Sequence, residues 1–478
     1  MRHQHPPLLH ILWDDSHIWG IIAARALRAM RIPFRLTRGK EIAAGLLRRE
    51  DAPLLLVPGG NARHKAESLG PSGIEEVREY VAGGGRYLGF CGGAGLALTA
   101  GGLSKGQGTG RAGGLGLCPW KRGRFDDRLQ HFMSGHLRVA LPGSASVCRD
   151  TSSGLLCPPG QGRKSPAPSS KAAPSSSDAK LRHYLIPTGL ADSPALPVWW
   201  PGRFEPEGGE GVTILAAYEQ PGPDFWLADL AIADLPPDTF DAWNAAYGVN
   251  ITPTFLAGQP CVVHGCFGAG EYVLSYSHLE TPDSPEANRW LAHLCSRMAG
   301  LEPACEHIPP WPVHSGQEPA AEPVGVAWDD PLLAAMAEDC ESIRQTGLKL
   351  GLLFERTDWL MGWRSGIPGA SLNNLWAALR VIRETEAHDA ARAFLALHGE
   401  SLRGTLSLFR ESCTQYFLAE RLAQAVSRFM PETVSLGLLN ERRTALFGPP
   451  MHAGGLYKTI IDVLDELAYL QLKDAASD

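Results

Sequence analysis

The stretch GGGRYLGFCGGAGLAL, residues 83–98, decides the fold of the first half of the chain. Its apolar part, RYLGF, is typical of a short buried strand, and GGAGLALTA can begin a helix directly after it. Cys91 stands at the junction, with Gly89 two residues before it and only glycine or alanine at the next four positions. The pattern predicts a sharp turn from strand to helix with a cysteine at its tip.

Strands and helices alternate on the N-terminal side of this turn. Buried strands are predicted at 8–13, 32–37 and within 52–60, and helices at 17–30, 40–50 and 73–84, the last with Ser72 as its N-cap. This alternation is typical of a parallel sheet with helices on both faces. Strand patterns return at LPVWW, GVTILAAYE and QPCVVHGCFGAGEYVLSYSHLE, and a helix capped by Ser284 is predicted over 284–300.

Two stretches inside this half lack the pattern. Residues near 101–117 are rich in glycine, and residues near 149–180 are rich in serine and proline, so we expect flexible inserts at both places. GQGTGR, at 106–111, lacks the lysine and hydroxyl residue that end a phosphate loop. Residues 1–300 are therefore predicted to form one α/β domain with two inserts.

The second half has a different texture. Residues 301–327 are rich in proline and are predicted to be a linker. Residues 328–478 show helical periodicity, with no convincing strand, in stretches at 329–347, 371–386, 389–399, 401–430 and 457–473. The sequence predicts an all-α domain of unknown family here. Its tryptophans, Trp359, Trp363 and Trp376, are interpreted as core residues, with partner binding as the alternative, and Arg442 and Arg443 form a short basic pair.

Composition narrows the classes of partner. The net charge of -7 and the pI near 6.2 give no reason to expect nucleic acid or an anionic membrane surface as a partner. The start of the chain lacks the pattern of a signal peptide, and no stretch of about 18 apolar residues is present, so we expect no membrane span. Ten scattered cysteines show no disulfide framework. These features predict a cytoplasmic protein with reduced thiols.

Cys91 allows two interpretations. Small neighbours and a following helix N-terminus suit a nucleophile, because they expose the thiol and favour the thiolate. A small buried residue in a glycine-rich bend is the other interpretation. His278 follows a predicted strand in SYSHLE, and Glu280 lies two residues further on. In an extended chain both side chains point the same way, so Glu280 can orient an imidazole that takes the thiol proton.

A family resemblance links these motifs. PGG at 58–60, EEVREYVAGGGRYLGFCGGAG at 75–95 and EYVLSYSHLE at 271–280 resemble the class I glutamine amidotransferase-like superfamily. Within it they are most similar to the domain at the N-terminus of eukaryotic biotin-protein ligases, over most of residues 8–297. The resemblance implies a flavodoxin-like parallel sheet, with Cys91 as nucleophile, His278 as base and Glu280 as the orienting acid. It also implies an oxyanion hole from the amides of Gly60 and Gly92, with Gly59 in the same loop.

The chain departs from that pattern at two places. Amidotransferases usually have leucine after the cysteine and a glutamine shortly beyond it, whereas this chain has glycines and no glutamine there, which speaks against glutamine as the substrate. Leu279 follows the histidine where the family commonly has proline. The GRGR-type loop of a biotin ligase is also missing, since KRGRF at 121–125 lacks its context, so a complete biotin ligase is not expected.

Two further groups of polar residues allow a functional interpretation. Cys261, His264 and Cys266 could suggest zinc, but they lie along one predicted strand, where alternation separates them, so a core strand is favoured. After the first strand, an acid of the Asp14–Asp15 pair could reach the Cys91 site, but capping of the next helix by Asp15 or Ser16 is favoured. The sequence predicts no cofactor and no metal.

Together these patterns give two hypotheses of function. The first is a cysteine-dependent hydrolase or amidotransferase-type enzyme acting on an amide in a small molecule or peptide. The alternative is a catalytically inactive binding or regulatory module. In either case the helical domain could bind a protein partner or self-associate.

Overall fold

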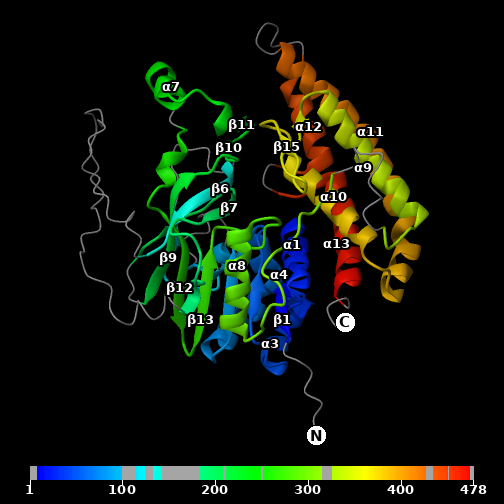
Figure 1. Cartoon of the computed structure of the whole chain (residues 1–478). Coiled ribbons are helices and arrows are strands. Elements are labelled where there is room, and N and C mark those ends of the chain that lie inside the picture. Colours follow the sequence, from blue (N-terminus) through cyan, green and yellow to red (C-terminus); the bar gives the residue numbers. More distant parts are fainter. Residues whose placement is uncertain are drawn as a thin grey trace.

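A computed structural model describes residues 8–99, 114–123, 133–142, 184–207, 211–248, 251–314, 326–426, 434–449 and 452–473. Figure 1 shows an α/β unit beside a unit of long helices. The predicted order, an α/β fold followed by a helical region, is therefore confirmed.

The centre of the α/β unit is a parallel sheet. Its neighbouring strands run in the order β2 (Phe34–Thr37), β1 (Leu9–Leu12), β3 (Leu55–Val57), β4 (Arg86–Phe90) and β13 (Gly270–Ser275), all parallel. The order of the first four strands, with a fifth parallel strand beside β4, is that of flavodoxin-like folds. The carboxyl ends of all five strands thus meet at one edge, where such sheets place ligands.

The sheet as a whole is mixed, which corrects the expectation of a parallel sheet. Beyond β13 it continues through antiparallel pairs with β12 (Pro260–Phe267), β9 (Val212–Pro221), β6 (Met133–Ala140), β7 (Ala195–Trp199), β10 (Trp226–Leu227) and β11 (Leu230–Ala231). A separate two-stranded pair joins β5 (Lys121–Arg122) and β8 (Phe204–Glu205). The predicted hairpin at 260–275 explains the first reversal, since a short turn can join only antiparallel strands.

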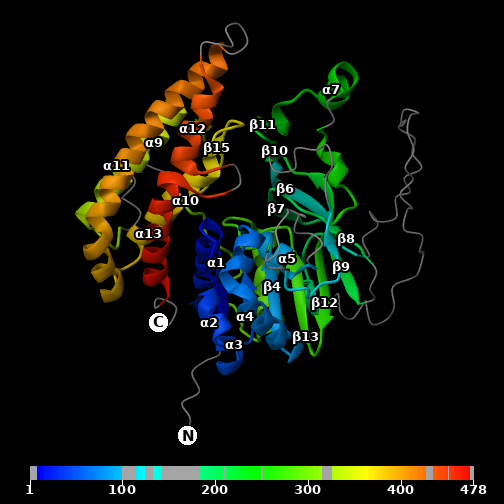
Figure 2. The ribbon, with the colours of Figure 1, turned by 180° about the vertical axis from the view of Figure 1, so that it is seen from behind.

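Helices cover both faces of the parallel part. One face packs against α2 (Gly39–Ala43), α3 (Leu46–Arg49), α4 (Ala62–Ala82) and α5 (Gly92–Ala97), which lie in front in Figure 2. The other face packs against α1 (Ile18–Ala29) and α8 (Pro285–Leu294), which continues as a π-turn over Cys295–Ala299. Two separate apolar cores result, one on each side of the sheet.

Two helices and one helix cap differ from the prediction. The helix expected at 40–50 is two short helices, since Gly45 between them has a left-handed φ of 82°. The helix expected at 73–84 forms the second part of α4, and an unpredicted first part from Ala62 precedes the kink at Gly70, where φ is 62°. Residue His17 precedes α1 without a side-chain cap, so the capping role predicted for Asp15 or Ser16 is wrong.

The end of the first predicted insert is described and packs against the core. Residues 114–117 are described, Leu115 and Leu117 are buried, and their amides donate to Leu96 O and Ala97 O at 2.7 and 2.9 Å. The end of this stretch therefore packs against α5. Residues 100–113 and the second predicted insert, 149–180, lie outside the described residues.

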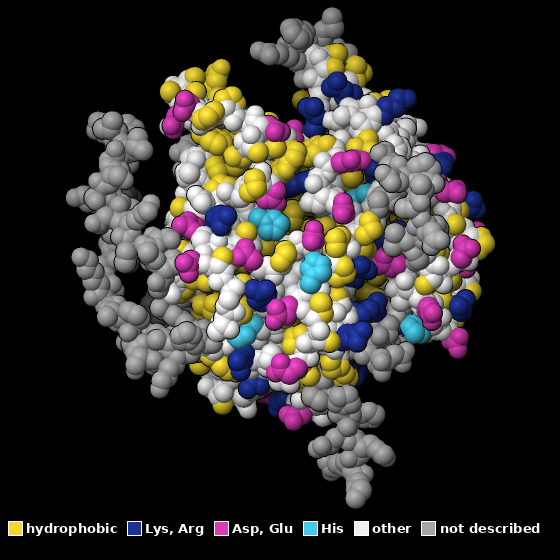
Figure 3. Space-filling view, viewed as in Figure 1, with side chains coloured by type: hydrophobic (Ala, Val, Ile, Leu, Met, Phe, Trp, Pro, Cys, Tyr) yellow, Lys and Arg dark blue, Asp and Glu magenta, His cyan; other side chains and the backbone are white. Residues whose placement is uncertain are grey.

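The antiparallel extension carries a segment of three short helices. These are η4 (Ile232–Asp234), α7 (Thr239–Tyr247) and η5 (Pro253–Leu256). None of the residues of α7 is buried. On the face seen in Figure 3, hydrophobic side chains gather over this region, and the side chain of Tyr247 there is 75% exposed.

The helical unit contains α9 (Pro331–Lys349), α10 (Gly369–Glu384), α11 (Asp389–Val426), α12 (Leu436–Phe447) and α13 (Gly455–Leu472). Asp330 caps α9 by accepting from the Leu332 amide at 2.9 Å, as its Asp-Pro pattern indicates. A short hairpin of β14 (Leu353–Phe354) and β15 (Gly362–Trp363) interrupts the helices, contrary to the prediction. Within the described ranges, no helix has the length and apolar character needed to cross a membrane.

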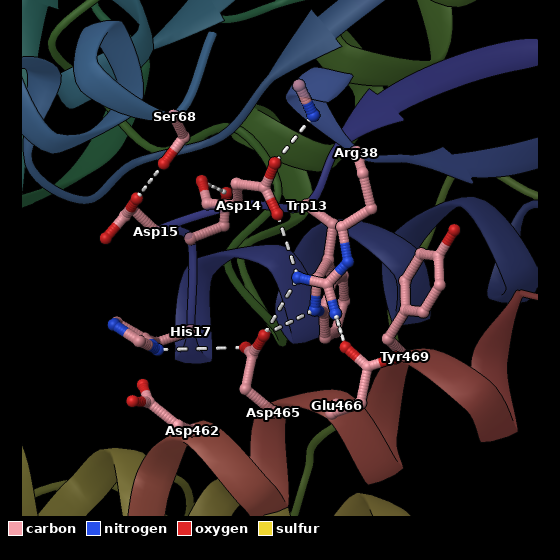
Figure 4. A network of polar contacts seen from close by, with 12 residues as sticks. Trp13, Asp14, Asp15, His17, Arg38, Ser68, Asp462, Asp465, Glu466 and Tyr469 are labelled. Atoms are coloured by element: carbon pink, nitrogen blue, oxygen red, sulfur yellow. Dashed lines mark hydrogen bonds and ion pairs between the residues drawn. The ribbon is translucent and has the colours of Figure 1, made fainter. Parts of the chain in front are cut away.

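The two units share one continuous apolar core, and a polar network joins them beside it. The stretch 301–314 runs between them with Ile308 and Trp311 buried. Figure 4 shows the network around Asp465 of α13. Its carboxylate accepts from the indole of Trp13 at 2.9 Å, lies 3.3 Å from Arg38 and 3.7 Å from His17. Burial alone would raise the pKa of Asp465, but His17, Arg38 and Trp13 together hold that pKa below its ordinary value.

We predict that Asp465→Asn lowers the free energy of unfolding by about 1–3 kcal/mol, since an amide removes the anion that faces His17 and one of the three carboxylates around Arg38. Because the folded-state pKa of Asp465 is depressed, its contribution is present above the ordinary carboxyl pKa of about 3.9 and is lost as pH falls further. Urea unfolding at several pH values measures both effects.

Asp462, one helical turn away, provides the matched control. Among the described residues its ion pair is with Lys458 on the same helix, and its side chain is 53% exposed against 14% for Asp465. Asp462→Asn should change stability by less than about 0.5 kcal/mol. Equal losses for the two variants would contradict the role given to the network.

Candidate active site

Cys91 occupies the tip of the predicted turn, between the last residue of β4 and the first of α5. Its φ of 45° is a left-handed value that a residue with a side chain rarely adopts. The Cys91 amide donates to Ser275 O at 2.7 Å, which ties the turn to the end of β13. The residue is partly exposed. This strained, anchored position is that of a nucleophile elbow.

Glycines around the turn allow three backbones to meet. A Cβ on Gly92 would lie 2.0 Å from Gly60 O, and one on Gly93 would lie 2.0 Å from Val57 O. Both distances are far inside van der Waals contact, so only glycine fits at either position. The cluster after Cys91 therefore serves to bring α5 against the loop that follows β3.

His278 and Glu280 lie together just beyond β13. The imidazole Nδ1 and a carboxylate oxygen of Glu280 are 2.8 Å apart, and both side chains are fully buried. The backbone amide of His278 donates to Pro197 O at 2.8 Å, which fixes the segment against β7. Among the described residues the other ring nitrogen, Nε2, has no hydrogen-bond partner. The base predicted from the sequence thus has its orienting acid in place and a second nitrogen available.

The electrostatics of Cys91 and His278 are those of a coupled pair. Burial raises the pKa of Cys91, but the interaction with His278, assisted by Arg122, outweighs burial and lowers that pKa. Burial lowers the pKa of His278, whereas Glu280 and Cys91 raise it to about 10. Since each group stabilises the charged form of the other, the arrangement favours a thiolate beside an imidazolium.

The loop Gly59–Gly60 lies against the same site. A Cβ on Gly59 would lie 2.8 Å from the His278 ring, and one on Gly60 would lie 2.3 Å from Asp15 O. Within the described part of the chain, the amides of Gly60 and Gly92 donate to no acceptor. Their backbones touch, and Gly92 directly follows Cys91 in the chain. The structure therefore brings together Cys91, His278, Glu280, Gly59, Gly60 and Gly92, the residues expected from the sequence.

Aromatic residues that the sequence reading did not assign to the site enclose the histidine. The Trp19 ring lies 4.2 Å from the His278 ring, and Trp359 of the helical unit packs edge-on against Trp19 at 6.0 Å. Trp359 also contacts Trp199 at 4.9 Å and is only 4% exposed. Trp359 thus belongs to the core, and that core shields His278 from water.

Lys65 is a second residue that the sequence reading missed. It is fully buried, and its ammonium donates to Asp14 O and Ser16 Oγ. Burial lowers the pKa of Lys65 to about 8, and the charges of Asp15, Asp14, Asp465 and Cys91 oppose the shift. Lys65 fixes the loop after β1 and places a positive charge near Cys91. A single lysine in the helical pattern ARHKAESL gives no sign of this in the sequence.

The neighbouring acids have structural partners. Asp14 accepts from the Gly39 amide at 2.6 Å and from Arg38 at 2.8 Å, and Asp15 accepts from Ser68 at 2.6 Å. Only the backbone of Asp15 approaches the Gly60 loop. Each carboxylate therefore holds the loop after β1 against another element.

The alternative metal group belongs to a core strand. In β12, Cys261 is buried, His264 contacts Glu271 at 3.2 Å and Cys266 is exposed. Over the described residues, no group of His, Cys, Asp or Glu has the arrangement of a metal site.

A serine–histidine–aspartate contact elsewhere in the α/β unit has a structural explanation. His136 lies 3.0 Å from the Ser284 hydroxyl and 2.7 Å from Asp224. Here the serine is buried and the acid is 48% exposed, the reverse of a catalytic triad, and Pro285 leaves no amide after the serine for an oxyanion. The contact joins the turn at residues 222–224 to the start of α8.

We predict that Gly60→Ala costs about 1–3 kcal/mol more stability than Gly84→Ala, measured by urea unfolding. The two positions share a φ of 111–112°, so the backbone strain of alanine is the same at both. A Cβ at residue 84 meets open space, whereas at residue 60 it meets Asp15 O. Equal losses would mean that the loops after β1 and β3 separate easily.

Comparisons with known proteins agree with part of this description. Residues 48–106, which include β3, the PGG loop, α4, β4 and Cys91, match the family model "Biotin-protein ligase, N terminal". No curated protein matches the chain.

Two solved structures align with part of the chain at low similarity. A β-galactosidase from Bacillus circulans sp. alkalophilus has 13% identity and a TM-score of 0.31, with 62% of this chain and 32% of that chain aligned. A putative ThuA-like protein from Bacteroides uniformis has 10% identity and a TM-score of 0.30, with 60% of this chain and 91% of that chain aligned. The chain thus spans about a third of the first of these proteins. The family match alone carries weight, and over residues 48–106 it confirms the predicted resemblance: this segment is similar to the biotin-protein ligase N-terminal domain.

Proposed function

We propose that the chain is a cysteine-dependent hydrolase or amidotransferase-type enzyme that cleaves an amide. One observation carries the proposal: the buried His278–Glu280 pair presents a free imidazole nitrogen near a thiol held on a strained elbow. The family match supports it only at the level of a glutamine amidotransferase-like domain.

In the first half-reaction, the Cys91 thiolate attacks the carbonyl carbon of the amide. The negative charge that develops on the carbonyl oxygen is stabilised by the Gly60 and Gly92 amides. The His278 imidazolium then donates its proton to the amide nitrogen, the C–N bond breaks, and the amine leaves as a thioester forms at Cys91.

In the second half-reaction, His278 acts as base. It takes a proton from water, the resulting hydroxide attacks the thioester carbon, and the C–S bond breaks to release a carboxylic acid and restore the Cys91 thiolate. Glu280 holds the imidazole at Nδ1 and stabilises the imidazolium. An amidotransferase would pass the released ammonia to an acceptor instead of to solvent.

The substrate class follows from the elbow. Without a glutamine after Cys91, the site lacks the group expected to hold free glutamine, so we propose a different small-molecule or peptide amide. The partly exposed Arg122 lowers the pKa of Cys91 and adds positive charge near the thiol. A cytoplasmic location is part of the proposal, since the eight described cysteines are all free thiols.

A second candidate is a binding or regulatory module without turnover. The observation that favours it is the cover that the helical unit places beside the site, where Trp359 packs on Trp19 next to His278. In this case the unit would act through a protein partner or a second copy. The two candidates differ in the reactivity they require of Cys91.

The test is the rate of Cys91 alkylation by iodoacetamide as a function of pH, followed by mass spectrometry. Because the pKa of Cys91 is lowered, the thiolate should persist below the ordinary cysteine value of about 8.5, and the rate should stay high there. His278→Ala removes the largest of the influences that lower the pKa of Cys91 against the effect of burial. The midpoint of the alkylation rate should therefore move to higher pH.

Cys266 is the control within the same sample. Cys266 is exposed, but partial desolvation of its thiol together with the charge of Glu271 raises the pKa of that thiol. Its alkylation rate should therefore rise only in alkaline solution and should be the same in wild type and His278→Ala. A Cys91 rate that follows Cys266 in both proteins would reject the enzyme and favour the binding module.

A further inference from the structure

A cavity of about 760 Å³ lies between the two units, within the size range of small-molecule sites. The α/β unit contributes the loop after β1 and the first turns of α4, including Asp15, His17 and His64. The helical unit contributes the start of α10, the end of α12 and the start of α13. Figure 4 shows Asp15, His17 and Asp462 on the walls that face one another.

The position in the sheet is one where α/β proteins bind ligands. Strand β1 has β2 on one side and β3 on the other, so the chain leaves β1 and β3 toward opposite faces of the sheet. The crevice at such a reversal, outside the carboxyl ends of the strands, is the usual ligand site of open parallel sheets. Here the helical unit closes the crevice into a cavity.

The acidic side chains of the wall already have partners. Asp15 accepts from Ser68 and lies 4.0 Å from His64, Glu67 pairs with Arg63, and Asp462 pairs with Lys458. Each of these carboxylates therefore has a polar or basic neighbour within the protein.

The opposite wall carries a donor without an acidic partner. Arg443 pairs with no carboxylate among the described residues and lies close to the Tyr416 hydroxyl. The His452 ring contacts the ring of His64, which belongs to the α/β wall and lies 4.0 Å from Asp15, with ring centroids 5.7 Å apart. Phe447 and Tyr457 line the cavity next to them and supply apolar surface. A guanidinium and two imidazoles beside aromatic rings suit an anionic group attached to a larger body.

We propose that this cavity binds a small molecule through a phosphate or carboxylate group, with Arg443 and His452 as the anion-binding residues. The site is separate from the candidate active site, because Cys91, His278 and Glu280 do not line it. It nevertheless begins at Asn61, directly after the Gly60 loop. A ligand here would touch both units at once.

Binding is tested by calorimetry and thermal unfolding on the full chain, with inorganic phosphate and citrate as probes and sodium chloride at equal ionic strength. Saturating ligand should raise the unfolding temperature, since it binds only the folded form. Tighter binding of phosphate or of citrate identifies which anion the site prefers. No binding of either up to about 10 mM, a range that covers millimolar dissociation constants, would overturn the proposal.

The neighbouring arginines give a matched pair of variants. Arg443→Ala should weaken binding about tenfold or more, the loss expected for a charged hydrogen bond, whereas Arg442→Ala, which removes an exposed charge outside the cavity, should stay within about twofold. Equal weakening by both variants would show a general charge effect and contradict the site.

Two further variants keep the outcome interpretable. His452 is exposed, so His452→Ala should fold normally and still weaken binding even if Arg443→Ala is unstable. Cys91→Ser should bind the probes like the wild type, because the thiol takes no part. An inert Cys91 with intact anion binding would reject the proposed chemistry alone, and the reverse result would reject this site alone.

Discussion

The contact between two glycine backbones is the constraint on which the site depends. A methyl group on Gly92 would lie 2.0 Å from Gly60 O, so the start of α5 and the loop after β3 touch without side chains between them. Cys91, one residue earlier, is thereby held at its left-handed φ. The same contact holds the Gly60 loop against the residue that follows Cys91, and the Asp15 carbonyl lies against Gly60 from a third side. Three loops at the sheet edge are thus locked together by the absence of side chains.

Against this rigid backbone stands a costly pair of buried charges. His278 and Glu280 have no exposed side-chain surface, and burying ions is unfavourable unless each has a partner at close range. The 2.8 Å contact compensates part of that cost, and the ring of Trp19 excludes water from it. A buried ion pair contributes little to the free energy of folding, because apolar residues of similar size would stabilise the fold as well. Its chemistry explains its presence better than its packing does.

Much of the site could be predicted from the sequence because its signals are local. The Cys91 turn is written in a run of consecutive residues, and His278 and Glu280 are two residues apart, with a family resemblance to join them. The start of α4 was missed because Gly70 and Pro71 look like an end of a helix, whereas the chain kinks there and continues. Leu115 and Leu117 were missed because glycines around them hide two core side chains. The Trp19–Trp359 and Trp13–Asp465 contacts join residues more than 300 positions apart, and no short pattern encodes them.

The shared core has a consequence for how the molecule is made. The α/β unit leaves the ribosome first. Trp19 can pack on Trp359, and the indole of Trp13 can donate to Asp465, only after those later residues have been synthesised. During synthesis, α1 therefore presents apolar surface that later residues must cover, a state open to chaperones and to aggregation. The tryptophan shield over His278 is completed only late in translation, so the nascent protein emerges with its histidine less protected than in the finished one.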